Sequence, residues 1–284
     1  MEIKAIIRRF MKRPTAVVGL VLLVVLIFSA AFAPLLAPYD PEVQDLLNVN
    51  QSFSSAHLLG TDYLGRDTFS RILYGARVSL TISFLGVIIG TLFGVMLGLI
   101  AGYYGGSIDY IIEYILTILL AYPGLLLALI IIAVFGSSNM NTMIAIAVFI
   151  VPSMARTVRG LALSLREQEY VQACKVAGAS DLRIIVTHVL PNCFSQIIVN
   201  CTLSFGGAIL TVSGLSYLGV GVQPPTPEWG MMLGEAREVM VLYPWQMLPP
   251  GLAILLVVAA CNYLGDSLRD ALDPRHAMHK EPVL

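Results

Sequence analysis

Charged side chains are scarce in this sequence. Asp, Glu, Lys and Arg make up 12% of its 284 residues, whereas they make up about a quarter of a typical soluble domain. Hydrophobic residues account for 57%, and the mean hydropathy is +0.81. The shortage of charge excludes a disordered, fibrous or ordinary water-soluble globular protein, and it predicts a protein embedded in a membrane.

The sequence also lacks the signatures of several kinds of site. Lys and Arg number 17 against 18 Asp and Glu, so there is no basic excess for a nucleic-acid partner. No lysine lies in a G-x-x-x-x-G-K-[ST] loop, and no H-E-x-x-H motif or nucleophile–base pair is visible, so we expect no catalytic residue and no cofactor bound by this chain. The four cysteines have no C-x-x-C spacing, which favours free apolar thiols over a metal or disulfide site.

Long uncharged stretches indicate where the chain crosses the membrane, because a spanning helix needs about 20 apolar residues to cross about 30 Å of hydrocarbon. The stretch 114–155 would be about 63 Å long as one helix. It also contains the turn-forming Gly136-Ser137-Ser138-Asn139, so it is divided into two spans. The sequence thus predicts an all-α membrane protein with six transmembrane helices, at roughly 15–37, 78–102, 111–135, 142–162, 195–218 and 248–267.

Basic residues predict the orientation of these helices, because cytoplasmic segments carry more Lys and Arg. Five lie in the first 14 residues, five between spans four and five and three in the tail, against four on the other side. Both termini are therefore expected in the cytoplasm, and the first apolar stretch is too long for a cleaved signal peptide, whose hydrophobic region has about 7–15 residues. The predicted segments are a cytoplasmic stub (1–14), a first transmembrane helix (15–37), an extracytoplasmic segment (38–77), a five-helix core (78–267) with a cytoplasmic loop at 163–191, and a cytoplasmic tail (268–284).

Small and helix-breaking residues mark two of the spans. Gly86, Gly90, Gly94 and Gly98 recur every four residues and would form one stripe on a helix. Such a stripe favours close helix packing, with a seam that slides during transport as the alternative. Pro123-Gly124 should kink the third span, which either lines a cavity or simply accommodates the proline.

Ionisable residues are almost absent from the middle of the spans. Asp109 and Glu113, at the inner end of the third span, come nearest. Their place at a helix N-terminus favours an interfacial position over a proton relay. A proton- or sodium-coupled carrier would be expected to bury charges at mid-membrane, so the energy for transport should come from elsewhere.

The loop between spans four and five is typical of two short helices joined by a sharp corner. Residues 167–177 are good helix formers, and Gly178 suits the left-handed position that ends such a helix. Ser180 is a good N-cap for the next helix, and Pro191 would stop that helix. Small residues keep the corner thin enough to enter a groove on a partner: Ala173, Ala177, Gly178 and Ala179.

This loop resembles the EAA loop of binding-protein-dependent ABC importer permeases, which contains their coupling helix. Gln172-Ala173-Cys174 takes the place of Glu-Ala-Ala, with Gln172 and Cys174 departing from the signature, and Gly178 and Leu190-Pro191 match it. Gln172 replaces the family's Glu and keeps its length and hydrogen-bonding ability, but it lacks the charge that a salt bridge to the ATPase would use. The resemblance implies an ATPase-coupling interface of eight residues: Glu169, Tyr170, Gln172, Ala173, Lys175, Gly178, Ala179 and Asp181.

Three further stretches are similar to the dipeptide/oligopeptide/nickel permeases, and specifically to their C-type subunit. The first, His57–Leu80, precedes the second span, and the second, Ser216–Gly230, follows the fifth. The third, Leu264–Pro274, lies near the end of the chain. Together these stretches extend the resemblance over residues 57–274.

This resemblance implies a transport role and a set of partners. The chain would form half of the translocation pathway of an ATP-driven importer for di- or oligopeptides, working by alternating access in the prokaryotic cytoplasmic membrane. Its partners besides the lipid bilayer would be a second homologous permease, two ATP-binding subunits that hold ATP and Mg²⁺, and an extracytoplasmic solute-binding protein. A nickel or metal-chelate importer is the alternative within the family, and a membrane-embedded enzyme or receptor scaffold is the alternative outside transport. His276 and His279 lie three apart in the tail without another ligand nearby, so no metal site is expected.

Overall fold

A computed structural model describes residues 3–272 of the 284-residue chain, and the predicted end of the tail with His276 and His279 lies outside this range. Helices dominate the described part, in which the single strand-like pairing is an isolated bridge between Thr61 and Asp67. The elements in chain order are α1 (Ile3–Met11), α2 (Pro14–Ala31), α3 (Ala33–Leu36), α4 (Thr68–Tyr104), α5 (Gly106–Leu120), α6 (Gly124–Phe135), α7 (Asn139–Arg166), α8 (Glu169–Val176), α9 (Asp181–Ile184), the π-helical turn η1 (Ile185–Val189), α10 (Leu190–Tyr217), α11 (Trp229–Val239), the 3₁₀ turn η2 (Pro244–Met247) and α12 (Leu248–Leu272).

Five of the helical stretches are long and apolar enough to cross a membrane, and the bent pair α5–α6 makes a sixth candidate. The all-α architecture is confirmed, and the six predicted spans are recovered when this pair is counted as one. α5 and α6 meet at 90°. Pro123 lies at the break, where its extended ψ of 130° leaves the helical path. The predicted kink is therefore a sharp corner, because proline both lacks a backbone donor and clashes with the preceding turn.

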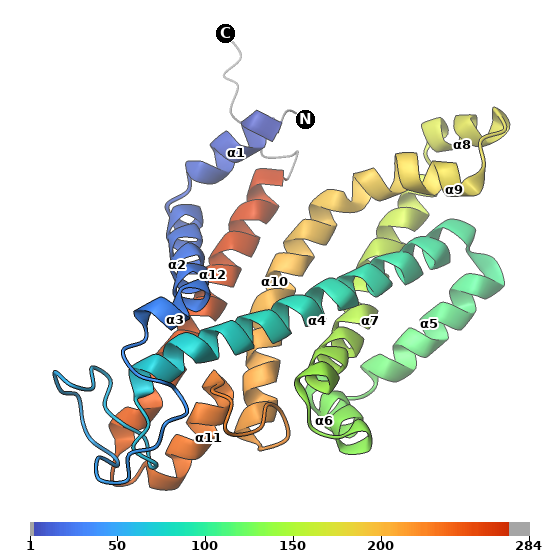
Figure 1. The fold of residues 1–284 in the computed structure, drawn as a ribbon. Helices are drawn as coiled ribbons and strands as arrows, with labels where there is room; N and C mark the ends of the chain where they lie inside the picture. Colours follow the sequence, from blue (N-terminus) through green and yellow to red (C-terminus); the bar gives the residue numbers. More distant parts are fainter. Residues whose placement is uncertain (1–2, 273–284) are drawn as a thin grey trace.

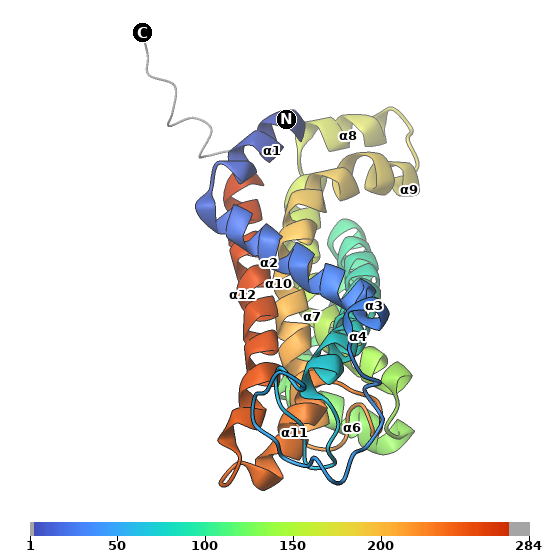
Figure 2. The ribbon, with the colours of Figure 1, turned by 60° about the vertical axis from the view of Figure 1, so that its left-hand side comes forward.

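The long helices run between two ends of the molecule, as Figures 1 and 2 show. α1, α8, α9 and the last turns of α12 lie at one end, named here the α8 end. Residues 38–67 and α11 lie at the opposite end, named here the α11 end. α4 crosses the molecule obliquely and packs along α7, while α2 packs against α12 and α4. The two predicted cytoplasmic features, the N-terminal stub and the loop after span four, thus share one end.

Three apolar clusters hold this arrangement together, and the smallest lies between α6, α7 and α10 around Leu215. The largest one joins α4, α7 and α10 through buried side chains such as Val87, Ile146 and Val212, and it extends to the α8 end through Val171. The second joins α2, α4, α10, α11 and α12 around the fully buried Trp229. Both α4 and α10 contribute to these two clusters, and the core is therefore built on this pair of helices.

The first two predicted spans differ from the structure at their ends. α2 stops at Ala31, and Phe32 separates it from the short α3, so the predicted helix 15–37 is interrupted. α4 begins at Thr68, ten residues before the predicted start, because the Asp67 side chain accepts a hydrogen bond from the Ser70 backbone amide at 2.8 Å and caps the helix. Arg71, whose charge suggested a loop, is a buried residue of this helix.

The fifth span is also longer than predicted, because Pro191 does not stop a helix. α9, η1 and α10 form one continuous helical path from Asp181 to Tyr217. The π-helical turn before Pro191 widens the backbone and accommodates the ring. Ser180 occupies the predicted N-cap position, but its side chain makes no capping hydrogen bond.

Candidate functional site

The corner between α8 and α9 is built by the backbone around Gly178. The Ala179 amide donates to the Cys174 carbonyl at 3.1 Å, and the Gly178 amide donates to the Lys175 carbonyl at 3.1 Å. This pair of bonds is the Schellman motif, which needs a left-handed residue after the helix. Gly178 supplies it with φ of +83°, as the sequence predicts. The chain therefore turns sharply at the tip of the α8 end.

Six of the eight residues predicted for the coupling interface are exposed at this corner: Glu169, Tyr170, Gln172, Ala173, Lys175 and Gly178. Ala179 and Asp181 are half-buried. The Asp181 carboxylate accepts a hydrogen bond from the Tyr103 hydroxyl of α4 at 2.8 Å, and the Gln172 amide donates to the Arg166 carbonyl at 2.7 Å. These two side chains therefore bind the corner to α4 and α7 of the same chain.

Two apolar residues outside the predicted interface project from the corner. Val176 is 90% exposed and Leu182 is 70% exposed, one on each side of Gly178. Val171 and Ile184 face the other way and are buried in the largest apolar cluster. Large apolar side chains exposed together mark interaction surfaces. The sequence pattern that could have identified them is the presence of one apolar residue on each side of the predicted corner.

The glycine stripe forms the contact between α4 and α7. Gly86, Gly90, Gly94 and Gly98 are all buried, and the next glycine in the series, Gly102, continues the stripe. A Cβ atom added at any of these positions would come within 3.0 Å of α7 atoms, which real side chains do not tolerate. The absence of side chains therefore lets the two backbones approach closely.

Replacing Gly98 by alanine tests this close approach. The added Cβ would lie 2.5 Å from the Ala155 carbonyl oxygen and 2.8 Å from the Val158 Cβ. We expect Gly98→Ala to destabilise the protein by about 1–3 kcal/mol through overpacking. In Gly160→Ala on α7 the added Cβ meets nothing within 4 Å, so we expect a gain of about 0.5–1 kcal/mol. Thermal unfolding in detergent measures both, and equal unfolding temperatures would contradict the packing role.

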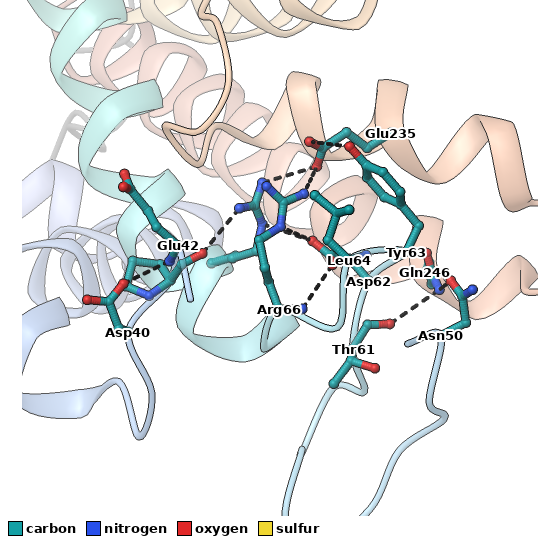
Figure 3. Close-up of polar contacts among 12 residues, drawn as sticks. Asp40, Glu42, Asn50, Thr61, Asp62, Tyr63, Leu64, Arg66, Glu235 and Gln246 are labelled. Carbon is teal, nitrogen blue, oxygen red and sulfur yellow. Dashed lines mark hydrogen bonds and ion pairs between the residues drawn. The ribbon is translucent and has the colours of Figure 1, made fainter. Parts of the chain in front are cut away.

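Buried charges link the segment 38–67 to α11 at the other end of the molecule (Figure 3). The Arg66 guanidinium donates to Asp62 at 2.6 Å and to Glu235 at 2.9 Å, and Arg71 donates to Glu235 at 3.1 Å. The arginine side chains are 2% and 1% exposed and that of Glu235 is 8% exposed. Burial raises the pKa of the Tyr63 phenol, whose hydroxyl lies 3.5 Å from Glu235. Two positive and two negative charges thus neutralise each other in a site that is largely shielded from water.

A second set of contacts joins α4 to the N-terminal end of α11. The Ser79 hydroxyl donates to the Glu228 carboxylate at 2.9 Å, and the Trp229 indole donates to the Ile72 carbonyl at 3.0 Å. The Trp229 ring packs on Gly75 and is fully buried. His57–Leu80 and the stretch ending at Gly230 therefore pack against each other.

The two acidic residues at the start of the third span pair with arginines of α7. Asp109 accepts two hydrogen bonds from Arg159, one of them at 2.7 Å, and Glu113 forms an ion pair with Arg156 at 2.6 Å. In the sequence, Arg156 and Arg159 serve only to predict the orientation of the spans. Their pairing neutralises both acids and connects α5 to α7.

The described fold, with its spanning helices and a short helical corner at one end, is similar to that of membrane chains in two solved ABC transporters. A solved structure of the MetNI methionine ABC transporter in inward-facing conformations shares the fold with a TM-score of 0.57 and 15% sequence identity, covering 72% of this chain and 97% of the other. The crystal structure of an amino acid ABC transporter with histidines has a TM-score of 0.55 and 15% identity, covering 72% and 95%.

Comparison of the sequence with known families gives a more specific assignment. Residues 94–277 match the binding-protein-dependent transport system inner membrane component, and residues 3–52 match the N-terminal TM domain of oligopeptide transport permease C. The glutathione transport system permease protein GsiD of Escherichia coli O1:K1 is 46% identical over 94% of this chain and 89% of its own length, and that of Shigella flexneri serotype 5b is 47% identical over the same shares. The chain belongs to the family of binding-protein-dependent transport system inner membrane components. It is a multi-pass protein of the bacterial inner membrane, and the resemblance to C-type permeases is confirmed.

Proposed function

We propose that this permease forms half of the translocation pathway of an ATP-driven importer for di- and oligopeptides, with glutathione as a representative cargo. The observation that carries the proposal is the similarity to glutathione permeases along 94% of the chain. The match of residues 3–52 to the oligopeptide permease C domain supports the same class of cargo. A second homologous permease would supply the other half of the pathway, and an extracytoplasmic solute-binding protein would deliver the cargo.

In this proposal the α8–α9 corner docks on one of two ATP-binding subunits in the cytoplasm. The exposed Val176 and Leu182 would enter a groove on that subunit, with Glu169 and Lys175 at the rim. ATP and Mg²⁺ would bind to the partner subunits, and closure of those subunits would push on the corner.

The helical path after the corner offers a route for this push. It continues from Asp181 to Tyr217 and so reaches from the α8 end to the α11 end. The hydrogen bond between Asp181 and Tyr103 also connects the corner to α4. Displacement of the corner would therefore tilt α10 and α4 together, and the permease half would rock against its partner to alternate access.

ATP hydrolysis by the assembled complex tests the cargo class. The complete importer is reconstituted in proteoliposomes, and its binding protein is offered reduced glutathione, an unmodified dipeptide or a nickel chelate. We expect glutathione or the dipeptide to stimulate ATP hydrolysis and to be transported across the membrane only when ATP is supplied. A complex without binding protein should hydrolyse ATP at its basal rate. Stimulation by the nickel chelate alone would contradict a peptide cargo.

A further inference from the structure

A hollow with charges of both signs opens at the α11 end, next to the start of α4. Its volume is about 370 Å³, and its lining includes Asp40, Glu42, Tyr74 and Arg77. Arg77 is exposed, and it forms no ion pair with a carboxylate of residues 3–272. One Asp40 oxygen accepts a hydrogen bond from the Glu42 amide, and the other is free to meet a cation. The hollow thus offers an unpaired cation and two acidic groups to one ligand.

Two apolar hollows continue from this one along the surface between α2, α4 and α10. The second hollow, about 410 Å³, shares Arg77 with the first and is otherwise lined mainly by apolar residues. The third, about 470 Å³, shares Ile27, Phe84 and Phe205 with the second and extends to Phe194. The Phe84 and Phe205 rings meet edge to face in the middle. We name the three hollows together the α2–α4–α10 groove.

The length of the groove matches one leaflet of a bilayer. Along α10, which runs between the two ends of the molecule, the groove extends from Phe205 to Phe194, eleven residues or about 16 Å. This is about half of the 30 Å hydrocarbon thickness. The charged end lies beside the last residues of α2, Ala30 and Ala31, where that helix ends, and the apolar end lies deeper between the helices. The groove therefore has its charged end where a lipid has its head group and its apolar end where a lipid has its acyl chains.

We infer that the α2–α4–α10 groove binds a phospholipid whose head group carries both a phosphate and a primary ammonium, as in phosphatidylethanolamine. Arg77 binds the phosphate, and Asp40 and Glu42 face the ammonium. An acyl chain runs past Phe84 and Phe205 into the third hollow. A peptide cargo does not fit, because most of its backbone polar groups would have no hydrogen-bond partners in the two mainly apolar hollows.

Photolabelling of the full-length chain in vesicles tests this site. The vesicles contain phosphatidylethanolamine with a photoreactive acyl chain, and labelled peptides are mapped by mass spectrometry. We expect labels to concentrate on Phe84 and on residues 194–205. Arg77→Gln removes a charge-assisted contact and should reduce this labelling about tenfold. Thr202→Phe fills the third hollow and should reduce it while every charge remains.

Matched variants separate a specific site from general contact with lipid. Arg237→Gln removes another exposed arginine of the α11 end, outside the groove, and should leave labelling unchanged. The double variant Asp40→Asn with Glu42→Gln should abolish the preference for phosphatidylethanolamine over phosphatidylglycerol. Even labelling of all lipid-facing helices in every variant would overturn the proposal. The proposal would also be overturned if assembly with the second permease abolished the labelling and Phe205 formed cross-links to that subunit.

Discussion

Replacing Gly178 by valine is expected to abolish ATP-driven uptake while membrane insertion stays normal. A Cβ at this position meets nothing within 4 Å, so the variant introduces no steric clash with a neighbour. The cost is conformational, because φ is +83° and left-handed backbone costs a non-glycine residue about 1–2 kcal/mol, more for a β-branched one. The corner should relax to another turn and displace Val176 and Leu182. Uptake, membrane fractionation and co-purification with the ATP-binding subunits measure the outcome.

Gly136 provides the matched control for this variant. It also has a positive φ, +87°, and its added Cβ also meets open space, but it ends α6 instead of the corner. Gly136→Val should therefore retain most of the uptake. A second variant, Val176→Asp with Leu182→Asp, keeps the backbone and should lose the ATP-binding subunits, whereas Val241→Asp, 88% exposed near the α11 end, should keep them. Normal uptake by Gly178→Val would refute the docking role of the corner.

Replacing Glu235 by alanine is expected to have the largest effect on stability. Its carboxylate accepts hydrogen bonds from both Arg66 and Arg71, so its loss leaves two buried guanidinium groups short of a partner. Removing one member of a buried ion pair costs about 3–5 kcal/mol. Glu238→Ala, on the same helix but exposed, is the control and should cost less than about 1 kcal/mol. Thermal unfolding in detergent distinguishes the two, and equal unfolding temperatures would show that the buried charges do not stabilise the α11 end.

The number of spans could be predicted from the sequence because lipid excludes charge over about 20 residues at a time. The same signal failed at the start of α4. Arg71 reads as a loop residue when it is considered alone, yet Glu235, which lies 164 residues further on, neutralises it inside the protein. A pairing over such a distance leaves no local pattern. The predicted span began after Arg77, an exposed residue of the same helix, because an uncharged stretch does not reveal a helix that continues past charged residues.

The corner shows the same division between local and long-range signals. Gly178 was recognised because a left-handed helix end is a property of a few neighbouring residues. The exposure of Val176 and Leu182 depends on which side of the corner packs against α7 and α10, and no local rule specifies that. The prediction that Pro191 stops a helix was wrong because the π-helical turn that accommodates this proline has no simple sequence signature.

The contact between the segment 38–67 and α11 has a consequence for biosynthesis. Arg66 is made 169 residues before its partner Glu235. At about 5–20 residues per second, a ribosome needs roughly 8–34 seconds to cover that distance. During this interval both Arg66 and Arg71 remain without their shared acceptor. The first quarter of the chain therefore cannot complete its folding until the last quarter has been synthesised. A nascent chain truncated before α11 should accordingly leave residues 38–67 open to protease, although its first helices are already inserted.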